Sequence, residues 1–132
     1  GLKQINWNLT KANGYFKVYE LTGLDKHIAP HFAEKLREIW GEKGITSYDL
    51  TNTTAYTLST KVESYRRLSQ TRFIDPKILT IQFETYIYNN VVALLSYDHS
   101  DIFGVEIYNE QLARQQEQLF DLVWDQSISV TS

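Results

Sequence analysis

The sequence predicts an α/β fold: a single domain over residues 1–132 in which helices flank a mixed β-sheet. Three observations predict this class. The first half alternates strand-like and helix-like segments, and the second half holds three strand-like segments separated by polar turns. The chain then ends in an amphipathic helix, whose apolar stripe needs a sheet to cover. At 132 residues and 42% hydrophobic content, one core can form without disulfides.

The first half provides two expected strands and two expected helices. Residues 14–21, GYFKVYEL, are rich in aromatic and β-branched residues and predict a strand. Pro30 suits the first turn of a helix. Residues 44–50, GITSYDL, predict a second strand, and residues 54–68 predict a second helix. The first helix carries an apolar stripe at helical spacing and ends at two glycines: Phe32, Leu36, Ile39 and Trp40, then Gly41 and Gly44. The second helix places Ala55, Leu58, Val62 and Tyr65 on one side.

The second half predicts three strands joined by tight turns. Residues 78–88, ILTIQFETYIY, alternate apolar and polar side chains, which indicates a half-buried strand. The pair Asn89-Asn90 is typical of a turn, because asparagine tolerates positive φ. Residues 91–97, VVALLSY, lack polar interruption and predict a strand buried on both faces. The polar turn DHSD, residues 98–101, leads into a third strand over residues 102–108.

The last helix has a clear start signal and a clear apolar side. Asn109 is a favourable N-cap, and Glu110 places negative charge in the first turn, where the helix dipole favours it. The apolar stripe consists of Leu112, Leu119, Phe120, Val123 and Trp124. We expect this amphipathic C-terminal helix to pack on the sheet and cover its apolar face.

Composition and charge exclude some function classes. The net charge of −3 argues against a free-standing nucleic-acid binder, since phosphate contacts need surplus lysine and arginine. Cysteine is absent, so disulfide and thiolate chemistry is excluded. The absence of cysteine, together with the absence of a signal-like or membrane-length apolar run, favours a cytoplasmic location and no membrane partner.

Charges are spread unevenly along the chain. Residues 61–77 hold five basic residues against two acidic ones, whereas residues 98–125 hold seven acidic residues against Arg114 alone. The two regions could attract each other or a partner subunit. They could equally be solvated faces that never meet, because exposed ion pairs contribute little.

The basic run YRRLSQTRF supplies the candidate binding residues Arg66, Arg67 and Arg72. Arg66 and Arg67 would lie on the second helix and Arg72 would begin the next strand. Such a cluster could hold an anion or a phosphate-bearing ligand through charge-assisted hydrogen bonds. The alternative is a salt-bridged surface against the acidic C-terminal third.

No catalytic, metal or cofactor site is predicted. His27 and His31 have the i, i+4 spacing of zinc helices, but Pro30 between them places His27 before the helix. His99 falls in a polar turn, where solvation is the simpler interpretation. The glycines form no phosphate-binding loop, and no G-x-S-x-G elbow is present.

Residues 72–124 resemble the C-terminal half of the effector domain in TrmB-type transcriptional regulators. The similarity lies in an Arg-Phe-led strand, a strand ending Ile-Tyr-Asn-Asn, the strand VVALLSY, then GVEIYN and a helix ending LFDLVW. The piece FAEKLREIWGEKGI and the strand after it resemble the preceding part of that domain, so the likeness covers roughly residues 14–127.

The resemblance implies a phospholipase D-like fold and a dimer. Phospholipase D enzymes carry an H-x-K-x4-D motif with a nucleophilic histidine. Here the positions two residues after the three histidines hold Ala29, Ala33 and Asp101, so the motif is missing. We therefore expect no phosphodiesterase activity. Regulators of this family contact DNA through a winged helix-turn-helix, and no such unit is recognisable in this chain.

The leading hypothesis is a non-catalytic ligand-sensing or oligomerisation domain of a TrmB-like transcriptional regulator. It would form a homodimer, bind a sugar-like or anionic small-molecule effector, and reach DNA only through a helix-turn-helix. A degenerate phospholipase D-like phosphodiesterase is one alternative. A protein-interaction module whose acidic C-terminal helix docks on a basic partner is another.

Overall fold

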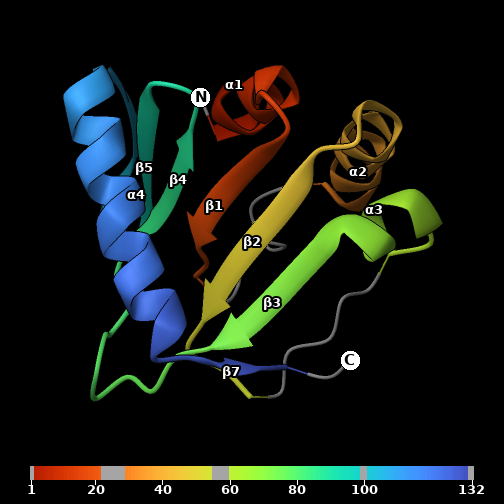
Figure 1. Cartoon of the computed structure of the whole chain (residues 1–132). Helices are drawn as coiled ribbons and strands as arrows, with labels where there is room; N and C mark the ends of the chain where they lie inside the picture. Colours follow the sequence, from red (N-terminus) through yellow and green to blue (C-terminus); the bar gives the residue numbers. More distant parts are fainter. Residues whose placement is uncertain (1, 22–28, 55–59, 99–100, 131–132) are drawn as a thin grey trace.

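The computed structural model describes residues 2–21, 29–54, 60–98 and 101–130. In chain order the elements are α1 (Leu2–Asn8), η1 (Leu9–Lys11), β1 (Tyr15–Tyr19), α2 (Pro30–Lys43), β2 (Thr46–Thr51), α3 (Glu63–Leu68), β3 (Ser69–Phe73), β4 (Glu84–Tyr88), β5 (Val91–Asp98), β6 (Asp101–Tyr108), α4 (Glu110–Asp125) and β7 (Ile128–Ser129). One sheet forms the middle layer, with α1, α2 and α3 on one side and α4 on the other (Figure 1). None of the described helices has both the length and the apolar character that crossing a bilayer requires.

The sheet is mixed, as the sequence predicts. Its seven described strands have the order β6-β5-β4-β1-β2-β3-β7. β1, β2 and β3 are parallel and are joined through the helices α2 and α3. The chain then crosses to the other side of β1, where β4, β5 and β6 form an antiparallel meander. The short strand β7 pairs antiparallel with β3 at the opposite edge.

Alternation along β1 divides the core into two faces. Phe16 and Val18 point to the side of the three N-terminal helices, where the Phe16 ring lies 5.1 Å from the ring of Trp40 on α2. We call this side the α2 face. Tyr19 points to the other side, the α4 face, where its ring lies 5.1 Å from that of Phe120 on α4. The predicted packing of the C-terminal helix on the sheet is therefore confirmed.

Local signals explain where the main helices begin and end. α2 starts at Pro30 and stops at Gly44, whose φ of 69° is left-handed and favours glycine. α4 starts after Asn109, whose side-chain oxygen accepts a 2.8 Å hydrogen bond from the backbone N–H of Leu112. The β4–β5 turn places Asn89 at φ 49°, a conformation that asparagine tolerates.

Three sequence expectations need correction. The strand expected over residues 78–88 is only Glu84–Tyr88. The preceding residues are held in a loop by Asn52, whose amide donates 2.9 Å hydrogen bonds to the carbonyls of Ile74 and Leu79 and whose oxygen accepts one from Ile81. In the helix expected over 54–68, residues 60–62 are not helical and helix occurs over Glu63–Leu68, while 55–59 lie outside the described residues. Arg72 does not begin its strand, because β3 already starts at Ser69.

The N-terminal helix is not among the predicted elements, and one member of the C-terminal stripe differs from expectation. α1 forms over Leu2–Asn8, and its Ile5 joins the core on the α2 face. Within α4, Phe120 is fully buried but Leu119 is 43% exposed. The helix therefore covers the middle of the sheet and leaves part of its own apolar stripe open.

Candidate ligand-binding site

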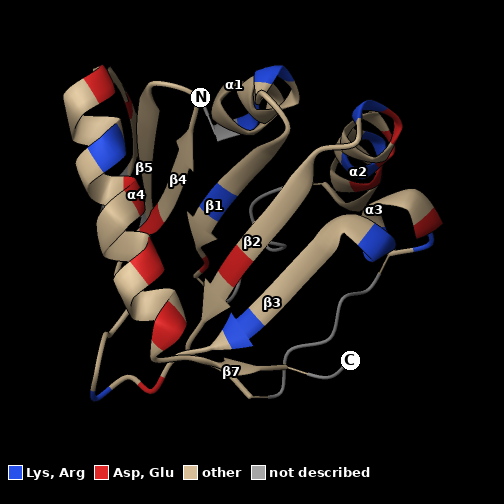
Figure 2. Cartoon of the chain, viewed as in Figure 1, with Lys and Arg blue, Asp and Glu red and all other residues tan. Residues whose placement is uncertain are grey.

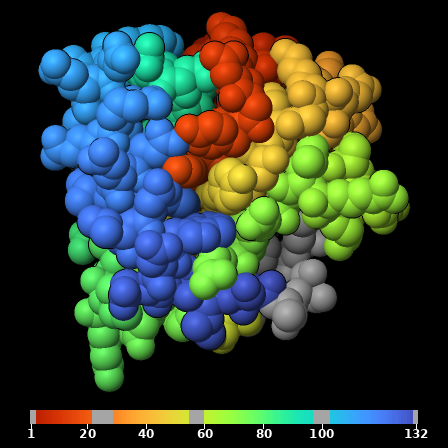
Figure 3. Space-filling model, viewed as in Figure 1, coloured from red at the N-terminus to blue at the C-terminus, as the bar shows by residue number. Residues whose placement is uncertain are grey.

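An open pocket of about 270 Å³ lies on the α4 face, between α4 and strands β1 and β2. In Figure 3 the blue surface of α4 borders the orange surface of β1 and the yellow surface of β2. Four of the six lining side chains are aromatic and two are charged: Tyr15, Tyr48, Phe120 and Trp124, with Lys17 and Asp121. A concave, mostly aromatic wall with a few polar groups is the usual composition of a small-molecule site.

The backbone explains how these side chains meet. Tyr15 and Lys17 occupy alternate positions of β1, so both point to the α4 face. Tyr48 of β2 is the register partner of Lys17, which places it directly beside the ammonium on the same face. On α4, residues 120, 121 and 124 share one side of the helix and meet these strands from above.

The aromatic rings form a continuous wall. The ring of Trp124 lies 5.7 Å from that of Phe120 in a stacked arrangement and 5.7 Å from that of Tyr48, edge to face. Tyr15 and Tyr48 are 6.2 Å apart, also edge to face. Phe120 is buried in this wall, whereas Tyr15, Tyr48 and Trp124 are partly exposed and offer apolar ring surface on which a ligand ring could lie.

The ammonium of Lys17 on β1 joins the sheet to α4 beside the aromatic wall. The ammonium of Lys17 donates to Asp121 Oδ1 at 2.7 Å and to Glu117 Oε2 at 3.0 Å. The hydroxyl of Tyr15 also donates to Glu117. Lys17 lies over the Tyr15 and Phe120 rings, at 5.4 and 5.9 Å from their centroids.

These contacts favour the charged forms of the lysine and of Glu117. Burial lowers the pKa of Lys17, but the hydrogen bonds to Asp121 and Glu117 outweigh it and the pKa is raised. Burial raises the pKa of Glu117, but the hydrogen bonds from Tyr15 and Lys17 outweigh it and the pKa is lowered. The positive charge in the pocket is therefore already neutralised by carboxylates. Such a pocket suits a ligand rich in hydroxyl groups better than an ion.

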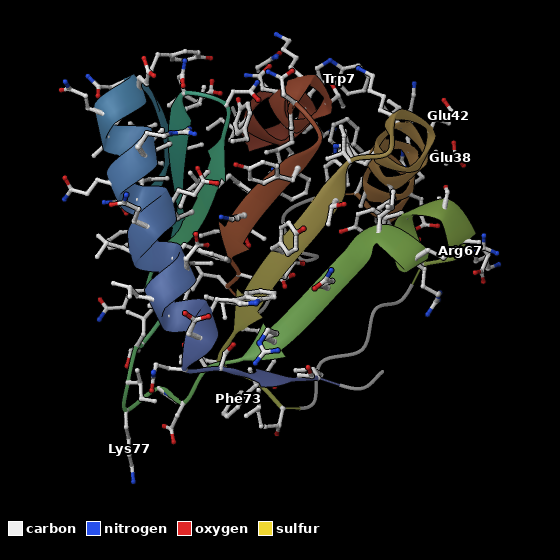
Figure 4. All side chains as sticks on the ribbon, in the orientation of Figure 1. Trp7, Glu38, Glu42, Arg67, Phe73 and Lys77 are labelled. Carbon is white, nitrogen blue, oxygen red and sulfur yellow. The ribbon has the colours of Figure 1, made fainter. Side chains whose placement is uncertain are left out.

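The three arginines predicted as an anion site do not share one local surface. Arg66 and Arg67 lie on α3, where Arg66 donates to the carbonyl of Thr60. Figure 4 shows Arg67 pointing outward from α3. Arg72 is the fourth of the five residues of β3, near the end of the strand that is far from α3. Figure 2 shows basic positions, in blue, both around α3 and at the far end of β3. Anion binding by these residues stays a prediction.

Arg72 instead fastens the C-terminal strand. Its guanidinium donates to Ser127 Oγ at 2.7 Å, to the Ser127 carbonyl at 2.5 Å and to Ser129 Oγ at 3.3 Å. It also stacks 5.3 Å from the centroid of the Trp124 ring. Arg72 thus holds the Trp124 ring of the aromatic wall in place by stacking on it.

The histidines do not build a site in the described part of the chain. His31 is exposed at the start of α2, while His27 and His99 lie outside the described residues. Among the described residues, no group of three histidine, aspartate or glutamate side chains could hold a metal ion.

A second polar cluster lies on the α2 face. It comprises the carboxylates Glu20 just after β1, Asp49 on β2 and Glu84 on β4, with Asp49 5% exposed and Glu84 fully buried. Burial raises the pKa of Asp49 to about 7, against the hydrogen bond from Ser47 and the charge of Arg37. Burial, reinforced by the charges of Asp49 and Glu84, holds the pKa of Glu20 well above its usual range.

Sequence reasoning missed Lys17, Tyr15 and Tyr48. The alternation of residues 15–19 contains the signal that Lys17 lies on the face opposite Phe16 and Val18. Its partners Glu117 and Asp121 stand at i, i+4 on the last helix. The contact between Lys17 and these carboxylates depends on the strand order, which places β1 beside β4, one of the strands on which α4 packs.

Solved structures share this fold. TrmBL2, an archaeal chromatin protein whose structure shows a novel mode of DNA binding, superposes with a TM-score of 0.67 at 12% identity, over 96% of this chain and 48% of its own. Nuc from Salmonella typhimurium, a phospholipase D family member, gives 0.65 at 15% identity, over 98% of this chain and 91% of its own. NucT from Helicobacter pylori gives 0.63 at 10% identity, over 97% and 89%.

These likenesses confirm the predicted phospholipase D-like fold, at identities that speak to the fold alone. The chain spans about half the length of TrmBL2 (48%). No family model matches the sequence, and no curated protein matches it either.

Proposed function

We propose that this domain is a non-catalytic ligand-sensing domain of a TrmB-like transcriptional regulator, and that the pocket under α4 holds its effector. The observation that carries the proposal is the wall of four aromatic rings beside the paired charges of Lys17 and Asp121. The fold shared with TrmBL2 supports it. A sugar-like effector fits best, because a sugar ring stacks on aromatic faces while its hydroxyls use charged side chains as donors and acceptors.

Sensing would work through linkage. A ligand in the pocket would contact α4 on one side and strands β1 and β2 on the other. It would therefore favour the arrangement in which the distance between α4 and the sheet fits the ligand. It can shift that equilibrium only by the difference between its affinities for the two arrangements. A helix-turn-helix module would contact DNA in response, and the net charge of −3 fits a domain that leaves that contact to another module.

Calorimetric titration with a panel of mono- and disaccharides, and separately with phosphate- and carboxylate-bearing compounds, tests the proposal. We expect a sugar to bind, with affinity falling about tenfold or more in Trp124→Ala. Trp7→Ala removes an equally large side chain, 36% exposed on α1, and should leave the affinity unchanged. Binding that ignores Trp124, or a panel in which nothing binds, would contradict the proposal. Binding of anions alone, lost on replacing Arg66 or Arg67, would favour the arginine site instead.

A phosphodiesterase is the second candidate, because the fold is also that of Nuc and NucT. The missing H-x-K motif argues against it. We expect no turnover of a bis(nitrophenyl) phosphate, with or without divalent ions. Turnover that disappears on replacing His27, His31 or His99 would show that the protein is a phosphodiesterase and would contradict the proposal of a non-catalytic sensor.

A further inference from the structure

The outer strand β6 has an unused pairing edge. It ends the sheet, so among the described strands only β5 pairs with its backbone. Its eight residues, DIFGVEIY, contain no lysine and no proline, and Glu106 is the one charged residue in its central part. The opposite edge is treated differently, because the two-residue strand β7 covers β3 there.

Hydrogen bonding along β6 fixes which backbone groups point outward. The N–H of Asn109 donates to the Asn90 carbonyl at 2.9 Å. Since these bonds alternate along an antiparallel pair, residues 103, 105 and 107 direct their backbone groups at β5. Residues 104, 106 and 108 direct theirs away from the sheet, where a further strand could bind them.

The α4 face of β6 is apolar and symmetric. Val105 pairs with Leu94 and belongs to the same face as Tyr19 and Thr85. Phe103 and Ile107 flank it on that face, so the apolar series has the same pattern in both directions about Val105. Val105 is 42% exposed, and Phe103 lies 6.2 Å from the ring of Phe83, itself 45% exposed.

α4 adds to this surface. Glu117 and Asp121 contact β1, so the opposite flank of the helix, with Leu112 and Leu119, points toward β5 and β6. Leu119 is 43% exposed. α4 and β6 thus both expose apolar side chains, Leu119 and Val105.

We propose that β6 pairs antiparallel with β6 of a second copy of this chain, about a two-fold axis at Val105, to form one continuous sheet. In this register Phe103 meets the partner's Ile107, and Val105 meets its own symmetry mate. Gly104 and Glu106 form the hydrogen-bonded pair, so each Glu106 faces a glycine rather than another carboxylate. Both α4 helices come to the same side of the joined sheet.

The neighbouring two-fold registers fit less well. An axis at residue 106 would place the two Glu106 side chains opposite each other, which is unfavourable for like charges. An axis at residue 104 would place the two Gly104 residues opposite each other, so that no side chains would meet at the axis. In the proposed register the Glu106 carboxylate remains bound to its own chain, where Asn8 Nδ2 donates to its two oxygens at 2.9 and 3.1 Å.

Cysteine cross-linking tests the register, since the chain has no cysteine of its own. Opposed residues of a non-hydrogen-bonded pair have Cα atoms about 4.5 Å apart, within disulfide range. We expect Val105→Cys to form a covalent dimer under mild oxidation. Tyr108→Cys is the matched control on the same strand, 68% exposed, and its two copies would lie roughly 20 Å apart. Tyr108→Cys should stay uncross-linked.

Light scattering after size exclusion tests the association itself. We expect the unaltered 132-residue chain to be a dimer at micromolar concentration and Val105→Lys to weaken association by about tenfold or more, because it opposes two positive charges at the axis. Ile78→Lys adds the same charge at a site 56% exposed in the loop before β4 and should leave the dimer intact. Circular dichroism confirms that each variant is folded. A monomeric chain, a dimer that survives Val105→Lys, or cross-linking as efficient at 108 as at 105 would overturn the proposal. None of these results depends on whether the pocket binds a sugar.

Discussion

The ammonium of Lys17 on β1 lies 3.0 Å from the carboxylate of Glu117 on α4, and both side chains are largely buried, at 13% and 14% exposed. Residues 100 positions apart are thus joined across the boundary between sheet and helix. Asp121, one helical turn later, accepts a second hydrogen bond from the same ammonium at 2.7 Å. Because a partly buried charge is costly without its partner, this contact fixes where α4 sits above the pocket.

Breaking that contact from one side should destabilise the domain. We expect Lys17→Met to lower the free energy of unfolding by about 1–3 kcal/mol, since Glu117 then keeps its charge with only Tyr15 and Arg114 as partners. The double variant Lys17→Met/Glu117→Leu should recover part of the loss, because no unpaired charge remains. Urea unfolding of the four proteins of this cycle gives the coupling. Strictly additive losses would show that the pair is not coupled.

The buried carboxylates on the α2 face predict an unusual pH dependence. With pKa values raised in the folded state, Asp49 and Glu20 hold protons that the unfolded chain, with ordinary carboxyl pKa values near 4, releases. The folded state therefore binds more protons, and its stability falls as pH rises from about 4 through about 7. Glu34 and Glu117, whose pKa values are lowered, lose their contributions only below this window.

The measurement is the urea midpoint between pH 5 and pH 8. We expect it to decrease across this range, and Asp49→Asn to raise it at pH 8 and to flatten the slope. Asparagine can still accept the hydrogen bond from Ser47. Glu38→Gln, at an exposed site on α2, is the matched control and should leave the slope unchanged. A midpoint that rises toward pH 8 would show that these carboxyls are ionised in the folded protein.

Local sequence patterns predict most helices and strands of the fold. The features that they do not predict depend on contacts between residues that are far apart in the sequence. Asn109 was identified as a cap from its position alone, and the alternation around Phe16 and Val18 identified β1. By contrast, nothing in the alternation of residues 78–83 indicates that Asn52 holds them in a loop through three hydrogen bonds. The run of arginines suggested a cluster because its members are near in sequence, but β3 carries Arg72 away from α3 to the edge beside β7.

The crossing of α2 and α3 depends on a glycine. A Cβ atom at Gly41 would lie 3.0 Å from Ser64 Cβ and 3.1 Å from the backbone nitrogen of Tyr65, and closer still to Ser64 Oγ. We expect Gly41→Ala to destabilise the domain by about 1–3 kcal/mol despite the better helix propensity of alanine. Thermal unfolding checks it. Adding Ser64→Gly removes the nearest atoms and should restore part of the loss; a Gly41→Ala variant as stable as the unaltered protein would contradict the close packing.

Arg72 offers the sharpest test of how the chain end is fastened. Lysine at this position keeps the charge but cannot donate to Ser127 and Ser129 together or stack flat on Trp124. We therefore expect Arg72→Lys to lower the free energy of unfolding by about 1–2 kcal/mol and to change the fluorescence of Trp124. The matched control is Arg67→Lys, at the exposed arginine on α3, which should change neither quantity. If both substitutions were neutral, the charge of Arg72 and not its geometry would hold β7 against β3, because the charge is the property that lysine retains.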